Sequence, residues 1–262
     1  MAELRDADLS GVEASVGRAH RFTAQEGSRL DRLFLDTLLQ ERPAAELLAA
    51  FEAGQTREGA FAPLRGEAEP GRSATLRVLE CLDALGLLDH PVPERACAYL
   101  CRAQTDDGGW DAADEEARIE ETGRTAGLLA KTPFVRGSIL RRGEAFLVER
   151  WTVERVKGPS YGPILAYTHL LTQLPSVHAD EILQWCGREL EGGLRLGVFS
   201  PLSVARVFLR ARATALPGAR IEATELVTGL ITGQQADGSW REEGLHPVDA
   251  TLEAVEALLR LS

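Results

Sequence analysis

The sequence predicts an all-α protein, an (α/α)6 toroid in which about six helical hairpins supply an inner and an outer ring of helices. Two observations predict this fold class: a repeated turn motif at regular spacing, and apolar residues at helical periodicity with almost no strand signal. The chain has 262 residues, of which 44% are hydrophobic and 26% charged. This ordinary globular composition suits one domain over residues 1–262, with a short flexible N-terminus at about residues 1–8.

The repeated motif consists of Gln, three residues, Gly, any residue and an aromatic residue. It occurs as QTREGAF from Gln55 to Phe61, as QTDDGGW from Gln104 to Trp110, and as QQADGSW from Gln234 to Trp240. The first two glutamines lie 49 positions apart and the last two lie 130 apart. The longer interval is close to three units of ~43 residues, so two degenerate copies are expected inside it.

Each copy has an apolar-periodic helix that runs up to the Gln, then a Gly-containing turn, then a second periodic helix. The first helices of the hairpins are expected near residues 9–20, 43–55, 93–104, 136–151, 178–190 and 219–234. Their partners are expected near 27–40, 73–86, 117–131, 161–174, 200–213 and 248–261. An open solenoid of HEAT or armadillo type has a similar unit length, so the turn motif is what favours a closed ring.

The three motif copies resemble the QW motif of squalene-hopene and oxidosqualene cyclases, which protein prenyltransferase β subunits carry in weaker form. The resemblance implies the terpenoid cyclase and prenyltransferase toroid fold over nearly the whole chain. It also implies that each Gln bonds toward the next inner helix while the aromatic ring stacks at the turn. Triterpene cyclases have two toroids with the active cavity between them, whereas this chain has the length of one, so a protein partner could complete a cavity.

Class II terpene cyclases protonate their substrate with an Asp of a DxDDT-like motif at the start of an inner helix. Two segments of this chain come nearest to that motif. HPVDAT begins at His246 and places Asp249 on the central acid, while RIEET places Glu120 there, followed by Glu121. Neither segment matches fully, and simpler interpretations exist: Asp249 as a helix N-cap, and the two glutamates as part of a solvated acidic run.

Other polar residues on expected inner helices are candidates for substrate binding. Arg206 and Arg210 lie four positions apart on one helix face, where two guanidiniums could hold a diphosphate, although ion pairs with neighbouring acids are the simpler interpretation. Tyr161, Tyr167 and His169 belong to PSYGPILAYTHLL and could line the central cavity, although helix packing explains Tyr167 equally well.

Several classes of function are disfavoured. With 29 Lys and Arg against 40 Asp and Glu, the formal charge of −11 repels nucleic acid. No apolar run approaches the length of a membrane span and no signal sequence is evident, so a cytoplasmic location is expected. The zinc-ligand DxC element of prenyltransferases does not occur and the five histidines are scattered, so neither a metal nor a cofactor is predicted. Four cysteines without a CxxC pair suit reduced core thiols.

Two functional hypotheses remain open. The first is a cyclase-like enzyme that uses acid-initiated, metal-independent cyclisation of an isoprenoid or other apolar chain, with Asp249 as the acid and Glu120 in reserve. The second is a non-catalytic ring that binds a hydrophobic ligand or a protein partner. Only 6% of residues are aromatic, and the inner helices carry charged stripes such as Arg77 with Glu80, and Asp249 with Glu253. If these stripes face the lumen, the lumen is not apolar.

Overall fold

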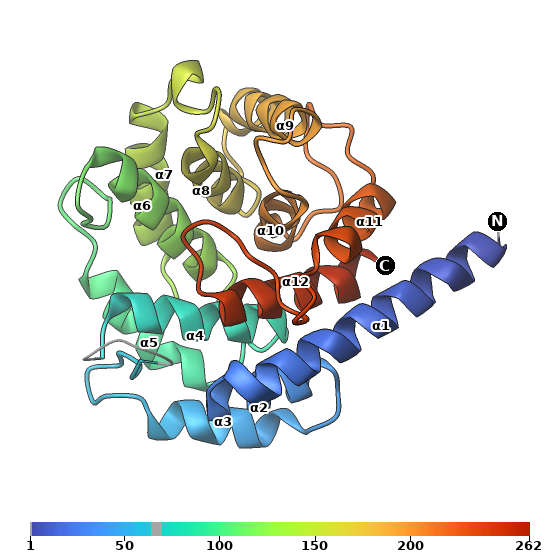
Figure 1. Cartoon of the computed structure of the whole chain (residues 1–262). Coiled ribbons are helices and arrows are strands. Elements are labelled where there is room, and N and C mark those ends of the chain that lie inside the picture. Colours follow the sequence, from blue (N-terminus) through green and yellow to red (C-terminus); the bar gives the residue numbers. More distant parts are fainter. Residues whose placement is uncertain (1, 64–69) are drawn as a thin grey trace.

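A computed structural model describes residues 2–63 and 70–262, and within those residues the regular secondary structure is entirely helical (Figure 1). The all-α prediction is therefore confirmed. The helices are α1 (Ala2–Glu26), α2 (Arg29–Leu38), α3 (Ala44–Ala53), α4 (Arg72–Ala84), α5 (Val92–Arg102), α6 (Glu115–Ala130), α7 (Gly137–Glu149), a 3-10 turn at Val153–Arg155, α8 (Tyr161–Leu171), α9 (Ala179–Arg195), α10 (Pro201–Ala211), α11 (Ala223–Gly233) and α12 (Pro247–Leu261).

Every helix expected from the periodicity has a counterpart at nearly the same residues, but the first one begins much earlier. A helix was expected near residues 9–20, whereas α1 runs from Ala2 to Glu26. Residues 2–8, expected to be a flexible tail, are thus helical, and α1 projects beyond the other helices toward the N-terminus (Figure 1). Met1 lies outside the described residues.

From α4 onward, the even-numbered helices contact one another in chain order. Contacts join α4 to α6, α6 to α8, α8 to α10, and α10 to α12, and α12 also contacts α2. The odd-numbered helix of each hairpin packs beside them, as α7 does on α6 and α9 on α8. Helix α1 contacts both α11 and α12, so the first and last hairpins meet although they lie at opposite ends of the sequence (Figure 1).

The three motif turns have the same backbone geometry because each uses its glycine in the same way. Gly59, Gly108 and Gly238 have φ values of 102°, 91° and 89°, a region that residues with a Cβ atom rarely adopt. A Cβ added to any of them would lie 2.2 to 2.5 Å from a backbone oxygen of an odd-numbered helix. The glycines thus allow each turn to rest directly on the backbone of α5, α7 or α1.

The motif glutamines tie each turn to itself and, in two copies, to another hairpin. Gln104 Nε2 donates to the carbonyl oxygens of Gly108 and Ile139, both at 2.9 Å. Gln234 Nε2 donates to Gly238 O and to Ser15 O on α1. The acceptors Ile139 and Ser15 lie on odd-numbered helices. The resemblance had implied bonds toward the next even-numbered helix, and the structure does not show them for Gln104 or Gln234.

The aromatic residue makes the link to the next even-numbered helix instead. The backbone N–H groups of Phe61, Trp110 and Trp240 donate to threonine hydroxyls on α4, α6 and α12 at 3.0, 3.0 and 3.2 Å. Those acceptors are Thr75, Thr122 and Thr251. Each indole Nε1 also donates to a carbonyl of the helix before its turn, at 2.8 Å. The two tryptophan copies thereby bond to both helices of their hairpins.

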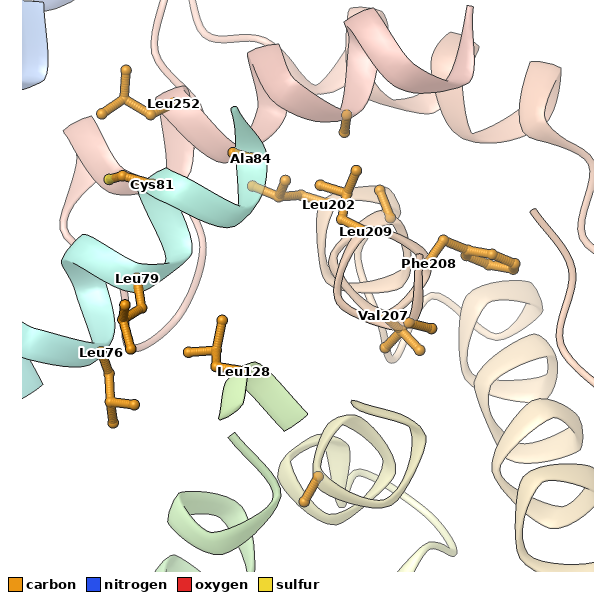
Figure 2. Packing of buried hydrophobic residues seen from close by; sticks show 14 of the residues in the cluster. Leu76, Leu79, Cys81, Ala84, Leu128, Leu202, Val207, Phe208, Leu209 and Leu252 are labelled. Carbon is orange, nitrogen blue, oxygen red and sulfur yellow. The ribbon is translucent and has the colours of Figure 1, made fainter. Parts of the chain in front are cut away.

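The apolar core lies between these helices. Leu76 and Leu79 of α4 lie on the side of that helix that faces Leu128 of α6 (Figure 2). The four cysteines are free, as expected, and three of them are buried. Burial raises the pKa of the Cys81 thiol to about 12, which makes it an unreactive part of the core. No described helix is both long and apolar enough to cross a membrane.

Candidate functional site

A cavity of about 800 Å³ opens at the N-terminal ends of the even-numbered helices. Its walls come from α4, α6, α8, α10 and α12 and from the loop before α12. Eight of the nine catalytic or binding candidates predicted from the sequence lie in these walls: Glu120, Glu121, Tyr161, His169, Arg206, Arg210, His246 and Asp249. The structure therefore brings these eight residues together around one cavity, although they come from helices far apart in the chain.

The walls of the cavity are charged. Among the described residues, five arginines and six carboxylates line it: Arg72, Arg77, Arg124, Arg206, Arg210, Glu80, Glu120, Glu121, Glu243, Asp249 and Glu253. The charged stripes noted on α4 and α12 thus face this cavity. Tyr161 is the only aromatic residue among the lining residues described.

Glu253 is the centre of a buried ion-pair network. Its side chain is 4% exposed, and its carboxylate oxygens lie 2.6 Å from Arg206 Nε, 2.9 Å from Arg210 Nη2 and 3.4 Å from Arg77 Nη1. Burial alone would raise the pKa of Glu253, but the guanidiniums of Arg206, Arg210 and Arg77 outweigh burial and lower it. Arg206 and Arg210 therefore pair with an acid of the chain, as the simpler interpretation expected.

Arg206 is only partly engaged by this network. The short contact between its Nε and Glu253 Oε2 lacks the alignment of a hydrogen bond, and both atoms are buried. Its guanidinium also lies 5.8 Å from the centre of the Tyr161 ring, as in a cation–π contact. Within the described residues, its two Nη atoms donate no hydrogen bond, so they are available to a molecule in the cavity.

A second network surrounds Glu80 on α4. Arg124 donates two parallel hydrogen bonds to its carboxylate, at 2.7 and 2.9 Å. Burial opposes ionisation of Glu80, but the nearby Arg124 and Arg210 lower its pKa far below the usual range of a glutamate. Glu80 and Glu253 are therefore both ionised, and each holds arginines in the cavity wall.

Asp249, the leading candidate acid, is held by an ion pair. Its Oδ1 accepts a hydrogen bond from Arg77 Nη2 at 2.6 Å. The N-cap of α12 is His246, whose Nδ1 accepts from Val248 N, so Asp249 lies in the first turn and is not the cap that the simpler interpretation expected. Asp249 is therefore bound by a guanidinium in the cavity wall.

Glu120, the reserve candidate, has a different environment at the exposed rim of the cavity. Partial burial of its carboxyl group, together with repulsion from Glu116, Asp114 and Glu121, raises its pKa. Its carboxylate lies against Gly162, since a Cβ on that glycine would lie 1.7 Å from Glu120 Oε1. Glu121 instead pairs with Arg72, whose Nε donates to it at 2.6 Å. Adjacent glutamates of α6 thus have different roles.

His169 is the most buried of the predicted residues that line the cavity. It is 1% exposed, and its Nε2 is buried without a hydrogen-bond partner among the described residues. Burial, assisted by the positive charges of Lys131 and Arg210, lowers its pKa well below the ordinary value, so the ring is neutral at pH 7. Buried polar atoms are nearly always hydrogen-bonded, so this nitrogen is one of a few exceptions among the described side chains.

The two tyrosines of α8 differ in position. Tyr161 lines the cavity and donates its hydroxyl proton to Ser203 O at 2.7 Å. Tyr167 is not among the lining residues, because it is fully buried between helices and donates to Leu147 O at 3.3 Å. Its ring meets that of Trp151 edge to face at 5.1 Å. Helix packing, the alternative considered for Tyr167, accounts for it.

Some lining residues were missed by sequence reasoning. Arg72 and Arg124 were not singled out, although Arg124 follows Glu120 by four positions and so shares its helix face. Elsewhere, the side chains of His20, Asp36 and Glu41 gather closely enough to hold a cation. Asp36 already accepts from Arg42 Nε at 3.0 Å, and that positive charge opposes a metal ion there.

Neither a family model nor a curated protein matches the chain. Among solved structures, it is similar to a protein from Actinoplanes, with a TM-score of 0.60 at 14% sequence identity. The likeness covers 95% of this chain and 99% of that one. At so low an identity the similarity concerns the fold alone.

Proposed function

We propose that the chain is an (α/α)6 toroid of the terpenoid cyclase and prenyltransferase type. The repeated Gln and aromatic ties, the contacts among even-numbered helices and the contact between first and last hairpins support this architecture. In it, the even-numbered helices are the inner ring and the cavity is the mouth of the lumen.

Within this toroid, the function proposed is the binding of a polar small molecule in the cavity. The observation that carries the proposal is the lining of five arginines and six carboxylates. A polyene substrate requires apolar walls, and stabilisation of carbocations draws on several aromatic faces, whereas Tyr161 is the one aromatic side chain among the described lining residues. Charged walls favour a ligand with charges and hydrogen-bonding groups of its own.

A cyclase-like enzyme remains the second candidate, because one lining residue has the property of a general acid. The pKa of Glu120 is raised, so more of it is protonated near neutral pH than of an ordinary glutamate. If acid-initiated chemistry takes place here, Glu120 is the better candidate for the acid, since Asp249 is paired with Arg77.

The test is a binding screen that includes both substrate classes. Purified protein is incubated with amino acids, sugar phosphates, dicarboxylates, prenyl diphosphates and polyprenes, and retained ligands are detected by native mass spectrometry. An Ala117→Trp variant, which places an indole at a lining position on α6, should lose the ligand. Ala145→Trp on the exposed face of α7 is the matched control and should retain it.

Binding of polar compounds that only Ala117→Trp abolishes is the expected result. Selective retention of polyprenes, or cyclised products in the extracts that Glu120→Gln removes, would replace the proposal by the cyclase hypothesis. Binding unaffected by Ala117→Trp would place the ligand outside the cavity.

A further inference from the structure

Ion pairs connect charged side chains of α4, α6, α10 and α12 into one network with an excess of positive charge. Its members are joined to one another at N···O distances of 2.6 to 4.0 Å: Arg77, Arg124, Arg206, Arg210, Arg260, Glu80, Asp249, Glu253 and Glu256. Within the described part of the chain, the network thus contains five arginines and four carboxylates. Even with all four carboxylates ionised, one positive charge is not balanced.

Arg206 is the arginine of this network whose donors are least used. Each of the other four donates at least one hydrogen bond, whereas Arg206 donates none to any described residue. Its Nε lies 2.6 Å from Glu253 Oε2, while Arg77 and Arg210 share the other oxygen of the same carboxylate. That Nε is a buried atom, but the two Nη atoms are not, so they are open to the cavity that Arg206 lines.

The guanidinium of Arg206 is fixed from two sides. Glu253 lies at its Nε, and the centre of the Tyr161 ring lies 5.8 Å from its central carbon. The Tyr161 hydroxyl donates to Ser203 O on α10, the helix that carries Arg206, and this bond of 2.7 Å holds the ring in place. The two Nη groups are therefore presented to the cavity without a rearrangement, and parallel N–H donors of a guanidinium match the two oxygens of a carboxylate.

We propose that the cavity binds a small molecule with one carboxylate group, which accepts hydrogen bonds from the Nη groups of Arg206. This inference rests on the function proposed above and specifies its ligand class. A single negative charge balances the excess charge of the network.

A dianion such as a phosphate monoester suits this cavity less well than a carboxylate. It would exceed the unbalanced charge, and it would be repelled more strongly by Glu120 and Glu243, which line the same cavity without an ion pair to any described residue. Both glutamates are exposed, so water weakens their repulsion of a single carboxylate.

The test compares ligands that share an unbranched alkyl chain and differ in the head group. Ala74, Leu165, Ala166 and Leu245 line the cavity and give such a chain apolar side chains to contact. Isothermal titration is carried out on the wild-type protein with hexanoate, hexanamide, hexylammonium and hexyl phosphate. We expect hexanoate to bind at least tenfold more tightly than each of the other three.

Two variants test the role of Arg206. Arg206→Lys keeps a positive charge beside Glu253 but removes the paired donors, so it should fold and should bind hexanoate about tenfold more weakly. The control Arg136→Lys, at an exposed position outside the cavity lining, should leave the affinity unchanged. Helical circular dichroism establishes that each variant is folded before titration, and the comparison of head groups decides without any variant.

Several outcomes would overturn the inference: no binding of hexanoate, equal affinity for hexanoate and hexanamide, tighter binding of hexyl phosphate than of hexanoate, or unchanged affinity of folded Arg206→Lys. If cationic or uncharged polar ligands bind in a manner sensitive to Ala117→Trp while carboxylates do not, the inference fails and the proposed function stands. If no polar ligand binds in that manner, both fail.

Discussion

Replacement of Glu253 by Gln should destabilise the fold strongly, because Glu253 balances the charge of three arginines in the interior. Its carboxylate lies within 2.6 to 3.4 Å of Arg206, Arg210 and Arg77 while only 4% of the side chain is exposed. Removing one partner of a buried ion pair costs about 3–5 kcal/mol, since it leaves uncompensated charge in a poorly solvated place. The amide keeps the size of the side chain and one acceptor oxygen, so we expect the lower end, about 3 kcal/mol.

Glu256 provides a matched control one turn further along α12. It is equally buried, but its nearest cations are Arg260 at 3.5 Å and Arg210 at 4.0 Å. Burial raises its pKa despite the opposing effects of Arg210 and Arg260, whereas the pKa of Glu253 is lowered. The carboxylate of Glu256 is thus poorly compensated, and Glu256→Gln should leave stability nearly unchanged or increase it at pH 7.

Urea unfolding followed by helical circular dichroism measures both variants. A loss of 3 kcal/mol should lower the midpoint of Glu253→Gln by about 1 M urea. Glu253 has a lowered pKa in the folded state, so its contribution is present above its ordinary pKa of 4.5 and is lost as the pH falls through the folded value. The difference between wild type and Glu253→Gln should therefore shrink in acid. Equal destabilisation by the two variants at pH 7 would refute the assignment of Glu253 as the central counter-ion.

Three further perturbations test the turns and the rim. Gly108→Ala should lower the free energy of unfolding by about 1–3 kcal/mol, because a φ of 91° is strained for a residue with a Cβ atom and the added atom meets Arg142 O. Gly192→Ala in α9 is the control: it has open space around it, so its thermal melting should show a neutral or stabilising effect. Gln234→Ala removes bonds to Ser15 O and from Arg18 Nε, so hydrogen exchange should accelerate in the part of α1 near these residues, and unchanged protection there would contradict the tie. Glu120→Gln should raise the stability of the protein at pH 7 but not below about pH 4.5, because a carboxyl group with a raised folded pKa destabilises the fold as the pH increases and the group ionises. The neighbouring Glu121→Gln loses the ion pair with Arg72, so it should not raise stability in the same urea or thermal measurement.

The helices could be predicted from the sequence because their determinants are local. Apolar periodicity and the glycine turns located every helix after α1 to within a few residues. The predicted start of α1 was wrong, since the first residues of this helix carry no apolar periodicity that distinguishes a helix from a tail. The direction of the Gln104 and Gln234 side chains was also wrong, because which neighbouring backbone a glutamine meets depends on packing between hairpins.

The cavity was predicted in part for a similar reason. Residues near the starts of even-numbered helices, such as Glu120, Tyr161 and Asp249, were chosen by position, and position does place them in the lining. Which carboxylate would be paired could not be read from the sequence, because Arg77 and Asp249 are 172 positions apart in the chain. Pairing of this kind is set by the assembled fold.

The groups that hold the hairpins together are separate from the groups that give the cavity its charge. Thr122 accepts the turn hydrogen bond from Trp110, while Glu121 and Arg124 on the same helix point their charges toward the cavity. On α12, Thr251 accepts from Trp240, while Asp249 and Glu253 face the arginines. Because a helix presents different faces to its turn and to the cavity, the lining can change from apolar to charged without loss of the ties. The repeated motif therefore carries information about the architecture, and the ligand has to be inferred from the arginines and carboxylates of the cavity.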